Sequence, residues 1–265
     1  MSLLTIDGVT QRFGGLTAVD NVSFDIAAGQ VSAIIGPNGA GKTTLFNLIS
    51  GFQSPLAGRI RFEGRDITGQ APHRIAALGI VRTFQLVQLF PDLSAHQNVE
   101  AGCHLRGSGG VWAALARPAR ARRELADAAA TAHELLAFVG LGERADMPAA
   151  ALTYGQQRLL EVARALAAGP RLLLLDEPAA GLNVEETEHL AGLIRAVIRR
   201  GITVLLIEHD MSLVMRVAQH IVVLDFGRRI AAGAPHAVQN DPAVLEAYLG
   251  GVDTAPPALA GAAHA

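Results

Sequence analysis

GPNGAGKT, residues 36–43, decides the fold, because it fits the phosphate-loop pattern Gly-x-x-x-x-Gly-Lys-Thr at every defined position. Glycines let successive backbone N–H groups curl around an anion without Cβ clashes. We expect a strand over Gln30–Ile35 and a helix over Lys42–Ile49, whose positive dipole end adds to these N–H groups. A chance glycine-rich turn is the alternative, and the strand and helix argue against it. The predicted cradle is Gly36, Pro37, Asn38, Gly39, Ala40, Gly41, Lys42, Thr43 and Thr44.

Within this cradle, Lys42 can reach the outer phosphates of a nucleotide and the Thr43 hydroxyl can bind Mg²⁺. The pattern differs from the dinucleotide motif Gly-x-Gly-x-x-Gly, because lysine and threonine hold its last positions. A cradle alone fits a kinase, a GTPase or a motor protein, so the remaining motifs must distinguish these classes.

Composition narrows the class of protein. Half of the 265 residues are hydrophobic, 17% are charged, and the formal net charge of −2 argues against a broad nucleic-acid surface. Cys103 is the single cysteine, which excludes an intrachain disulfide and suits a reducing compartment. The N-terminus lacks a signal-peptide pattern and no apolar run is long enough for a membrane span. We therefore expect a soluble, cytoplasmic chain that reaches a membrane through a partner or a surface patch.

The pattern along the chain predicts one domain over residues 1–251 and a loose tail over 252–265. Short strand-like pieces open the chain, and residues 59–67 favour a hairpin. Residues 92–165 form a helical insertion, with one long helix over Arg117–Val139. Apolar strands then alternate with helices, which implies a parallel sheet covered on both faces. The later expected elements are strands 172–175 and 202–207, and helices 157–168, 186–199 and 242–249.

Two carboxylates, Asp176 and Glu177, follow the apolar run Leu172–Leu175. Asp176 is placed to hold Mg²⁺ through water, and Glu177 to orient or deprotonate an attacking water. A small-molecule kinase does not need the second carboxylate, because water is the wrong nucleophile for it. A plain strand-end turn is the alternative, which the preceding phosphate loop disfavours.

Leu152-Thr153-Tyr154-Gly155-Gln156 resembles the signature motif of ATP-binding cassette (ABC) proteins, often written LSGGQ. Tyr154 replaces the first glycine of the commonest form. The resemblance implies that Thr153, Gly155 and Gln156 bind the γ-phosphate of an ATP that another subunit holds. It also implies the fold: an α/β P-loop NTPase (RecA-like) core with an antiparallel β subdomain and an inserted α-helical subdomain.

The other cassette elements appear in order, and the resemblance assigns each a role. Gln85 matches the glutamine that touches Mg²⁺ and water, Phe13 the aromatic that stacks on adenine, and His209 the histidine that contacts the γ-phosphate. Alone, each would more simply be a packing, loop or structural residue. Residues 180–183 stand at the D-loop, where Asn183 replaces the usual aspartate and puts a charge-based role in doubt. The implied catalytic set is therefore Glu177, His209 and Gln85, with Thr43, Gln85 and Asp176 as metal ligands.

Longer stretches, including VRTFQLVQLFP, LTYGQQRLLEVARAL, DEPAAGLN and LLIEHDMSLVM, resemble the larger ATPase subunit of branched-chain amino acid importers. Urea importers carry a very similar subunit, and the lipopolysaccharide-export ATPase a less similar one. His220 departs from the usual aspartate, and we assign it no role. The resemblance implies a peripheral protein at the cytoplasmic face of the inner membrane, with ATP and Mg²⁺ as cofactors. The implied partners are a second ATPase, as heterodimer or homodimer, membrane permease subunits and indirectly a solute-binding protein, and no nucleic acid.

Several alternatives stay open at this stage. A soluble cassette protein of ribosomes or DNA repair usually has two cassettes or long insertions, which this chain lacks, and a regulatory module without turnover would not need Glu177 and His209. The transported solute is not readable from these residues. We expect the membrane subunit to contact residues 85–98, including Phe90 and Leu93, although core packing is an equal alternative. Lipid headgroups near Arg117, Arg120, Arg122 and Arg123 are less expected than a solvated helix face.

Overall fold

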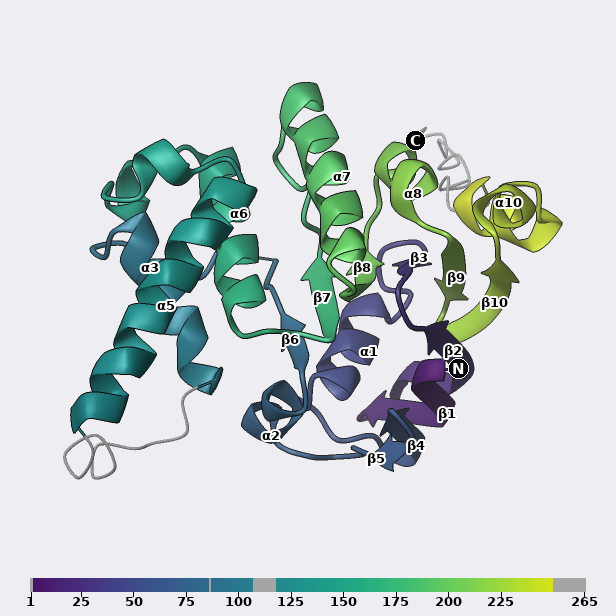
Figure 1. Ribbon diagram of the computed structural model, residues 1–265. Helices are drawn as coiled ribbons and strands as arrows, with labels where there is room; N and C mark the ends of the chain where they lie inside the picture. The colour runs from purple at the N-terminus through teal and green to yellow at the C-terminus, as the bar shows by residue number, and fades with distance from the viewer. Residues whose placement is uncertain (1, 86, 107–117, 250–265) are drawn as a thin grey trace, which may run out of the picture.

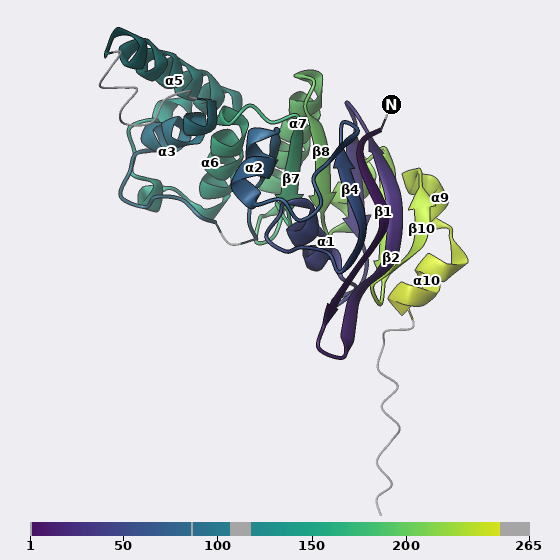
Figure 2. The same ribbon diagram turned by 90° about the horizontal axis from the view of Figure 1, so that it is seen from below.

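The computed structural model describes residues 2–85, 87–106 and 118–249 (Figure 1). Two sheets lie on either side of helix α1 (Lys42–Ile49), and a group of helices projects from the far end of the larger sheet (Figure 2). Helix α1 has the predicted bounds and follows directly from the phosphate loop, which leads from the larger sheet. The fold is therefore the predicted mixed α/β cassette.

The larger sheet has six strands in the order β10-β9-β3-β8-β7-β6. Its strands are β3 (Val31–Ile35), β6 (Ile80–Arg82), β7 (Leu172–Asp176), β8 (Thr203–Ile207), β9 (His220–Asp225) and β10 (Arg228–Gly233). The five neighbouring strands β9, β3, β8, β7 and β6 pair in parallel, as predicted, but β10 pairs with β9 antiparallel. The purely parallel expectation is wrong at this edge, because the two-residue turn Phe226-Gly227 returns the chain directly, whereas a parallel neighbour needs a long crossover.

The smaller sheet is antiparallel, in the order β2-β1-β4-β5. Its strands are β1 (Ser2–Phe13), β2 (Leu16–Ala27), β4 (Ala57–Phe62) and β5 (Arg65–Asp66). The predicted hairpin of residues 59–67 is β4 with β5, joined by Glu63-Gly64. The opening strands are two continuous runs of 12 residues each rather than short pieces. Shifts of register along the β1–β2 pair explain this, because such irregularities break the alternation of apolar and polar residues without ending the pairing.

Strands β3, β7 and β8 of the larger sheet are buried on both faces, as the apolar runs predicted. In β7, Leu172 and Leu174 face the core shared with α1 and the smaller sheet, whereas Leu173 and Leu175 face the helices on the other side. Successive strand residues point to opposite faces, so a strand covered on both faces needs an unbroken apolar run. The polar residues Asp176 and Glu177 therefore come where the strand leaves the core.

The inserted helical region contains α3 (Ala95–Gly102), η1 (Cys103–Arg106), α5 (Pro118–Phe138) and α6 (Tyr154–Ala167). Helix α5 agrees with the predicted long helix, although Arg117 lies outside the described residues, as does the tail 252–265. Short 3-10 turns η2 (Gly142–Arg144) and η3 (Ala149–Ala151) lead to α6. Buried residues Val99, Leu136 and Leu160 join α3, α5 and α6 to the core on the outer side of the sheet.

The remaining helices are α2 (Pro72–Ala77), α7 (Val184–Arg199), α8 (Met211–Val217), α9 (Pro235–Gln239) and α10 (Pro242–Leu249). Within the described ranges, none of the helices combines the length and the hydropathy that crossing a bilayer requires.

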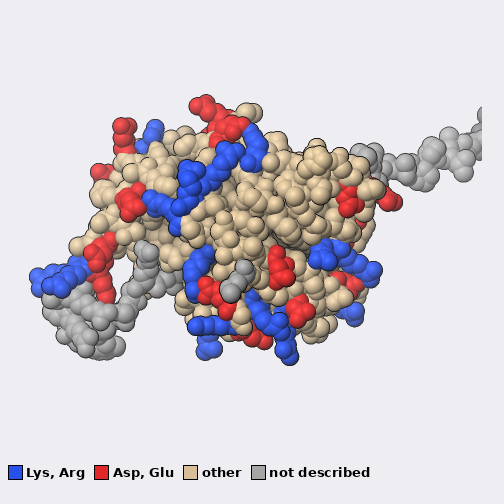
Figure 3. Space-filling model, turned by 45° about the vertical axis from the view of Figure 1, so that its right-hand side comes forward, with Lys and Arg blue, Asp and Glu red and all other residues tan. Residues whose placement is uncertain are grey.

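On the side shown in Figure 3, acidic and basic side chains are intermixed and large areas carry neither. This side therefore does not present an unbroken basic surface.

Candidate functional site

The phosphate loop joins β3 to α1 in a conformation that only glycine permits at its two ends. Gly36 and Gly41 have φ of 149° and 97°. A Cβ atom at Gly36 would lie 2.0 Å from the Leu224 carbonyl oxygen, and one at Gly41 would lie 2.2 Å from the Ala18 carbonyl oxygen. Neighbouring backbone therefore fixes the shape of the loop from both sides.

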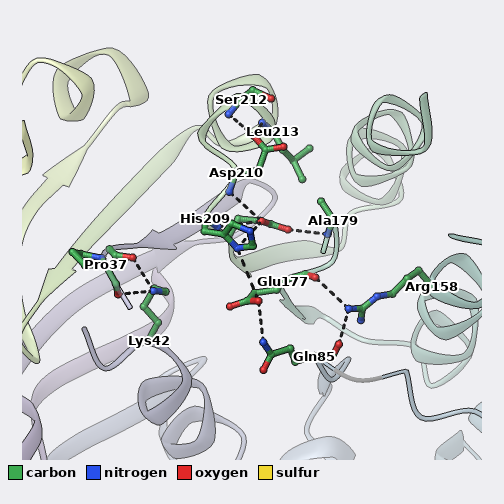
Figure 4. A network of polar contacts seen from close by, with 12 residues as sticks. Pro37, Lys42, Gln85, Arg158, Glu177, Ala179, His209, Asp210, Ser212 and Leu213 are labelled. Atoms are coloured by element: carbon green, nitrogen blue, oxygen red, sulfur yellow. Dashed lines mark hydrogen bonds and ion pairs between the residues drawn. The ribbon is translucent and has the colours of Figure 1, made fainter. Parts of the chain in front are cut away.

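Lys42 is buried beneath this loop, where its ammonium donates to the carbonyls of Gly36 at 2.8 Å and Pro37 at 2.9 Å (Figure 4). Burial lowers the pKa of Lys42, and the nearby carboxylates of Glu177 and Asp176 oppose that effect. The ammonium thus lies under the loop, where an incoming phosphate can replace the carbonyls as its partner.

An open pocket lies over the loop and brings together most of the predicted nucleotide residues. Phe13 stands at its rim with 46% of its surface exposed. Asp176, Gln85 and His209 do not line it, although Glu177 does. The lining residues are Phe13, Leu16, Thr17, Ala18, Asn38, Gly39, Ala40, Gly41, Lys42, Thr43, Thr44, Glu177 and Phe226.

The three predicted catalytic residues meet at the carboxyl edge of the larger sheet (Figure 4). Gln85 Nε2 donates to Glu177 Oε2 at 3.0 Å, and His209 Nδ1 lies 3.9 Å from the same oxygen. Glu177 has a φ of 47°, a left-handed conformation that is uncommon for a residue with a side chain. Its N–H donates to the Ile207 carbonyl at 3.0 Å, which holds this conformation against β8.

Arg82 is a buried partner of Asp176 that the sequence reasoning passed over. Its guanidinium donates to Asp176 Oδ2 and to Asn47 Oδ1, both at 2.7 Å, and to Ser50 Oγ at 3.1 Å. The rings of Phe46, Phe52 and Phe84 surround it, with centroids 5.4–5.9 Å from its central carbon. Arg82 therefore links the carboxylate at the end of β7 to helix α1.

Glu208 is a second residue that the sequence reasoning missed. Its side chain is fully buried, and it accepts hydrogen bonds from the backbone N–H groups of Ala179 at 2.8 Å and His209 at 3.1 Å. It thereby ties the loop that carries Glu177 to the loop that carries His209. The only signal in the sequence is its position directly after the apolar run that ends at Ile207.

Glu208 should make stability depend on pH. Burial raises its pKa above the ordinary value of 4.5, so the folded protein retains a proton that the unfolded chain releases. Its contribution to the free energy of unfolding must then fall as pH rises above that value and through the raised pKa. Because Glu208→Gln is neutral, the stability of the natural chain minus that of the variant should decrease as the pH is raised from 4.5 upwards.

Urea denaturation across this pH range measures the difference. Glu161, a second buried carboxylate whose pKa burial raises, should show the same sign in Glu161→Gln. A stability difference that stays constant or increases with pH would contradict the burial argument.

The signature residues form a separate site, away from the pocket over the phosphate loop. Thr153 Oγ1 accepts from the Gln156 N–H at 3.3 Å, and the Gln156 side chain accepts from the Thr153 N–H at 3.1 Å. This reciprocal capping box begins α6. Thr153, Gly155 and Gln156 line a cleft with α7, in which a Cβ atom at Gly155 would lie 2.2 Å from the Glu186 carboxylate. The described chain thus does not bring these three residues to its own cradle.

Asn183 begins α7 with the same kind of capping box. Its side-chain oxygen accepts from the Glu186 N–H at 2.9 Å, and Glu186 accepts from the Asn183 N–H at 3.0 Å. Asparagine and aspartate are about equally good N-caps. The departure from aspartate at this position therefore retains the local structure and removes only the charge.

Arg158 connects the signature helix to the catalytic loops, a role that nothing in its sequence position indicates. Its guanidinium donates to the Gln85 carbonyl at 2.6 Å and lies 3.5 Å from the Glu177 carbonyl (Figure 4). It also donates to the Phe84 carbonyl at 2.9 Å. Its carbon also lies 5.4 Å from the centre of the Tyr154 ring. A movement of α6 would therefore act directly on the backbone that carries Gln85 and Glu177.

The residues predicted to hold Mg²⁺ offer suitable oxygen donors. Thr43 supplies an exposed hydroxyl in the pocket, Gln85 an amide oxygen, and Asp176 a carboxylate of which Arg82 binds the Oδ2 atom. Such hard oxygen donors, with water completing the shell, suit Mg²⁺. Among the described residues, no group of three or more His, Cys, Asp or Glu forms a metal cluster. The donor set fits a cation held jointly with phosphate oxygens.

Comparison with protein families agrees with this geometry. Residues 19–180 match the family model "ABC transporter", and residues 228–254 match "Branched-chain amino acid ATP-binding cassette transporter". The chain is 46% identical to BraF, a high-affinity branched-chain amino acid transport ATP-binding protein of Pseudomonas aeruginosa, over 94% of this chain and 98% of that protein. It is 42% identical to LivG of Escherichia coli, which has the same description, over the same shares of the two chains.

Solved structures show the same fold. A nucleotide-free ATP-binding cassette from an ABC transporter superposes with a TM-score of 0.82 at 32% identity, covering 94% of this chain and 99% of that one. A cassette in its ADP conformation matches with the same TM-score, identity and coverage. The likeness therefore extends over almost the whole chain in both sequence and structure.

Proposed function

This chain belongs to the ABC transporter family as an ATP-hydrolysing subunit of an importer, and from that premise we propose that it powers the uptake of branched-chain amino acids across the inner membrane. The observation that carries the cargo class is the 46% identity to BraF over 94% of the chain. The match of residues 228–254 to the branched-chain amino acid family model supports it independently.

In the proposed reaction, ATP lies in the pocket over the phosphate loop with its base near Phe13 and its outer phosphates near Lys42. Glu177 accepts a proton from the attacking water. Gln85 and His209 both lie beside its Oε2 atom, and of these two His209 contacts the γ-phosphate. Mg²⁺, when bound by Thr43, Asp176 and Gln85, would supply positive charge against the phosphate oxygens.

Two copies, or this chain and a related ATPase, are proposed to meet head to tail. The separation of the signature cleft from the cradle within one chain supports this arrangement, because Thr153, Gly155 and Gln156 then complete the site of the opposite subunit. Closing requires the capping box of Thr153 to share its N–H groups with the incoming phosphate. Closure and reopening would move the membrane subunits between inward and outward states.

The proposed contact with a permease is the loop before α3. Phe90 and Leu93 expose 51% and 37% of their surfaces there. Buried Asn98 holds the loop, donating to the carbonyls of Phe90, Leu93 and Ser94 at 3.0–3.2 Å. A loop that is held by these hydrogen bonds and presents apolar side chains supports a docking role at the cytoplasmic face of the membrane.

Uptake by cells tests the proposal. Strains carrying either the natural chain or Glu177→Gln as the only copy, at equal protein levels, would be supplied with labelled leucine, isoleucine, valine, glutamate or urea. We expect the mutant to lose uptake of the three branched-chain amino acids and to retain that of the others. Selective loss of urea uptake would replace the cargo but keep the mechanism, and equal uptake of every solute in both strains would refute the proposed cargo class.

A further inference from the structure

Phe226 lies in a conformation and an environment that both disfavour it. It is the first central residue of the two-residue turn between β9 and β10, with φ of 41°, and Gly227 follows with φ of 76°. Positive φ at both central positions is the requirement of a type I′ turn, for which Asn-Gly is the preferred pair. The side chain is also 86% exposed, the most of any large hydrophobic residue in the described ranges.

A second turn in the chain has the same geometry and provides a comparison. Glu63 and Gly64, between β4 and β5, have φ of 50° and 76°. There, the side chain at the strained position has a partner, because Glu63 forms an ion pair with Arg171. The ring of Phe226 contributes to neither hydrophobic core cluster of the described chain. Local structure therefore accounts for Glu63 but not for Phe226.

The Phe226 turn is fixed against the phosphate loop. Gly227 N–H donates to the Ala40 carbonyl at 3.1 Å, and its carbonyl accepts from the Asp20 N–H at 2.8 Å. A Cβ atom at Gly41 would lie only 3.5 Å from Gly227 Cα. The backbone of the turn is consequently held beside the cradle, and Phe226 lines the same pocket as Phe13 and Lys42.

We propose that Phe226 is a second aromatic wall of the nucleotide site, which packs with Phe13 against the base of ATP. A flat, apolar base covers aromatic surface that would otherwise face water, and aromatic contacts stabilise beyond the area that they bury. Binding of the base thus offsets both the exposure of the ring and its strained backbone. This inference rests on the nucleotide site of the proposed function and adds a residue to it.

Phe226→Asn distinguishes the strain of the turn from the loss of the ring. Relief of the strain should stabilise the protein, whereas loss of the ring should weaken ATP binding. Asparagine suits the left-handed turn, so the thermal unfolding midpoint without nucleotide should rise, by about 2 °C. Loss of the ring should weaken ATP binding about three- to tenfold. Calorimetric titration in a Glu177→Gln background, which prevents turnover, measures ATP and inorganic tripolyphosphate separately. Tripolyphosphate has no base, so its affinity should not change.

Glu63→Asn is the matched control, since it makes the same exchange in the same kind of turn outside the pocket. It should leave the affinities for ATP and tripolyphosphate unchanged. Unchanged ATP affinity in Phe226→Asn would overturn the proposal, as would an equal loss for both ligands, which would indicate a distorted cradle. If the Glu177→Gln chain itself bound neither ligand, the nucleotide site of the proposed function would be wrong as well.

Discussion

Glu177→Gln should lower the rate of ATP hydrolysis by about 100- to 10,000-fold while ATP still binds, because it removes the proposed base and little else. Glutamine has nearly the same size and the same backbone requirement, so the left-handed conformation of residue 177 is retained. In the natural chain, Gln85 donates to the Glu177 carboxylate at 3.0 Å. The amide oxygen of the introduced glutamine can accept the same hydrogen bond. The change therefore isolates the loss of the proton acceptor.

Phosphate release at saturating ATP, calorimetric ATP binding and size-exclusion chromatography measure this prediction. The variant should also accumulate as an ATP-bound dimer, since hydrolysis no longer separates the subunits. Glu143→Gln, which changes an exposed acid in η2, serves as a control and should hydrolyse ATP at the natural rate. A monomeric Glu177→Gln chain with normal turnover would show that another group activates the water.

Arg82→Met should reduce the free energy of unfolding by about 3–5 kcal/mol, because it leaves Asp176 buried without a compensating charge. The side chains of Arg82 and Asp176 are only 6% and 3% exposed, and their N–O distance is 2.7 Å. Methionine occupies similar volume, so the loss should come from the unpaired carboxylate more than from a cavity. Adding Asp176→Asn to this variant should recover much of the stability.

Denaturant titration of the two single variants and the double variant gives the coupling energy between the residues. Arg171→Met is a matched control, because Arg171 also pairs with a carboxylate, that of Glu63, and lies 5.4 Å from the Phe62 ring centre. That pair is 52% and 33% exposed, so its loss should cost no more than about 1 kcal/mol. Equal costs for Arg82→Met and Arg171→Met would argue against a structural ion pair at Asp176.

Local signals were enough to predict the framework of the site. The glycine pattern and the turn residues gave helix α1 its bounds, and the apolar runs located β7 and β8. These features depend on neighbours in the chain. The antiparallel edge strand β10 was missed because Phe226-Gly227 lacks the Asn or Asp that marks most two-residue turns.

Three buried charged residues, Arg82, Arg158 and Glu208, could not be recognised from their sequence positions. Each looks like an ordinary polar residue beside a motif, and charged side chains are almost always exposed. Their burial follows from contacts between segments as distant as residues 82 and 176, or 158 and 84. His220 remains without an assigned role, although its Nδ1 is buried without a hydrogen-bond partner.

Strand β7 has consequences for how this protein can change over evolutionary time. Its four leucines are all buried, with alternate ones committed to opposite cores, so a mutation of any of them can only exchange one apolar side chain for another. Glu177, which follows the strand, is only partly buried and carries no such packing obligation. Selection can therefore alter the chemistry at that edge one residue at a time, while the strand tolerates almost no drift.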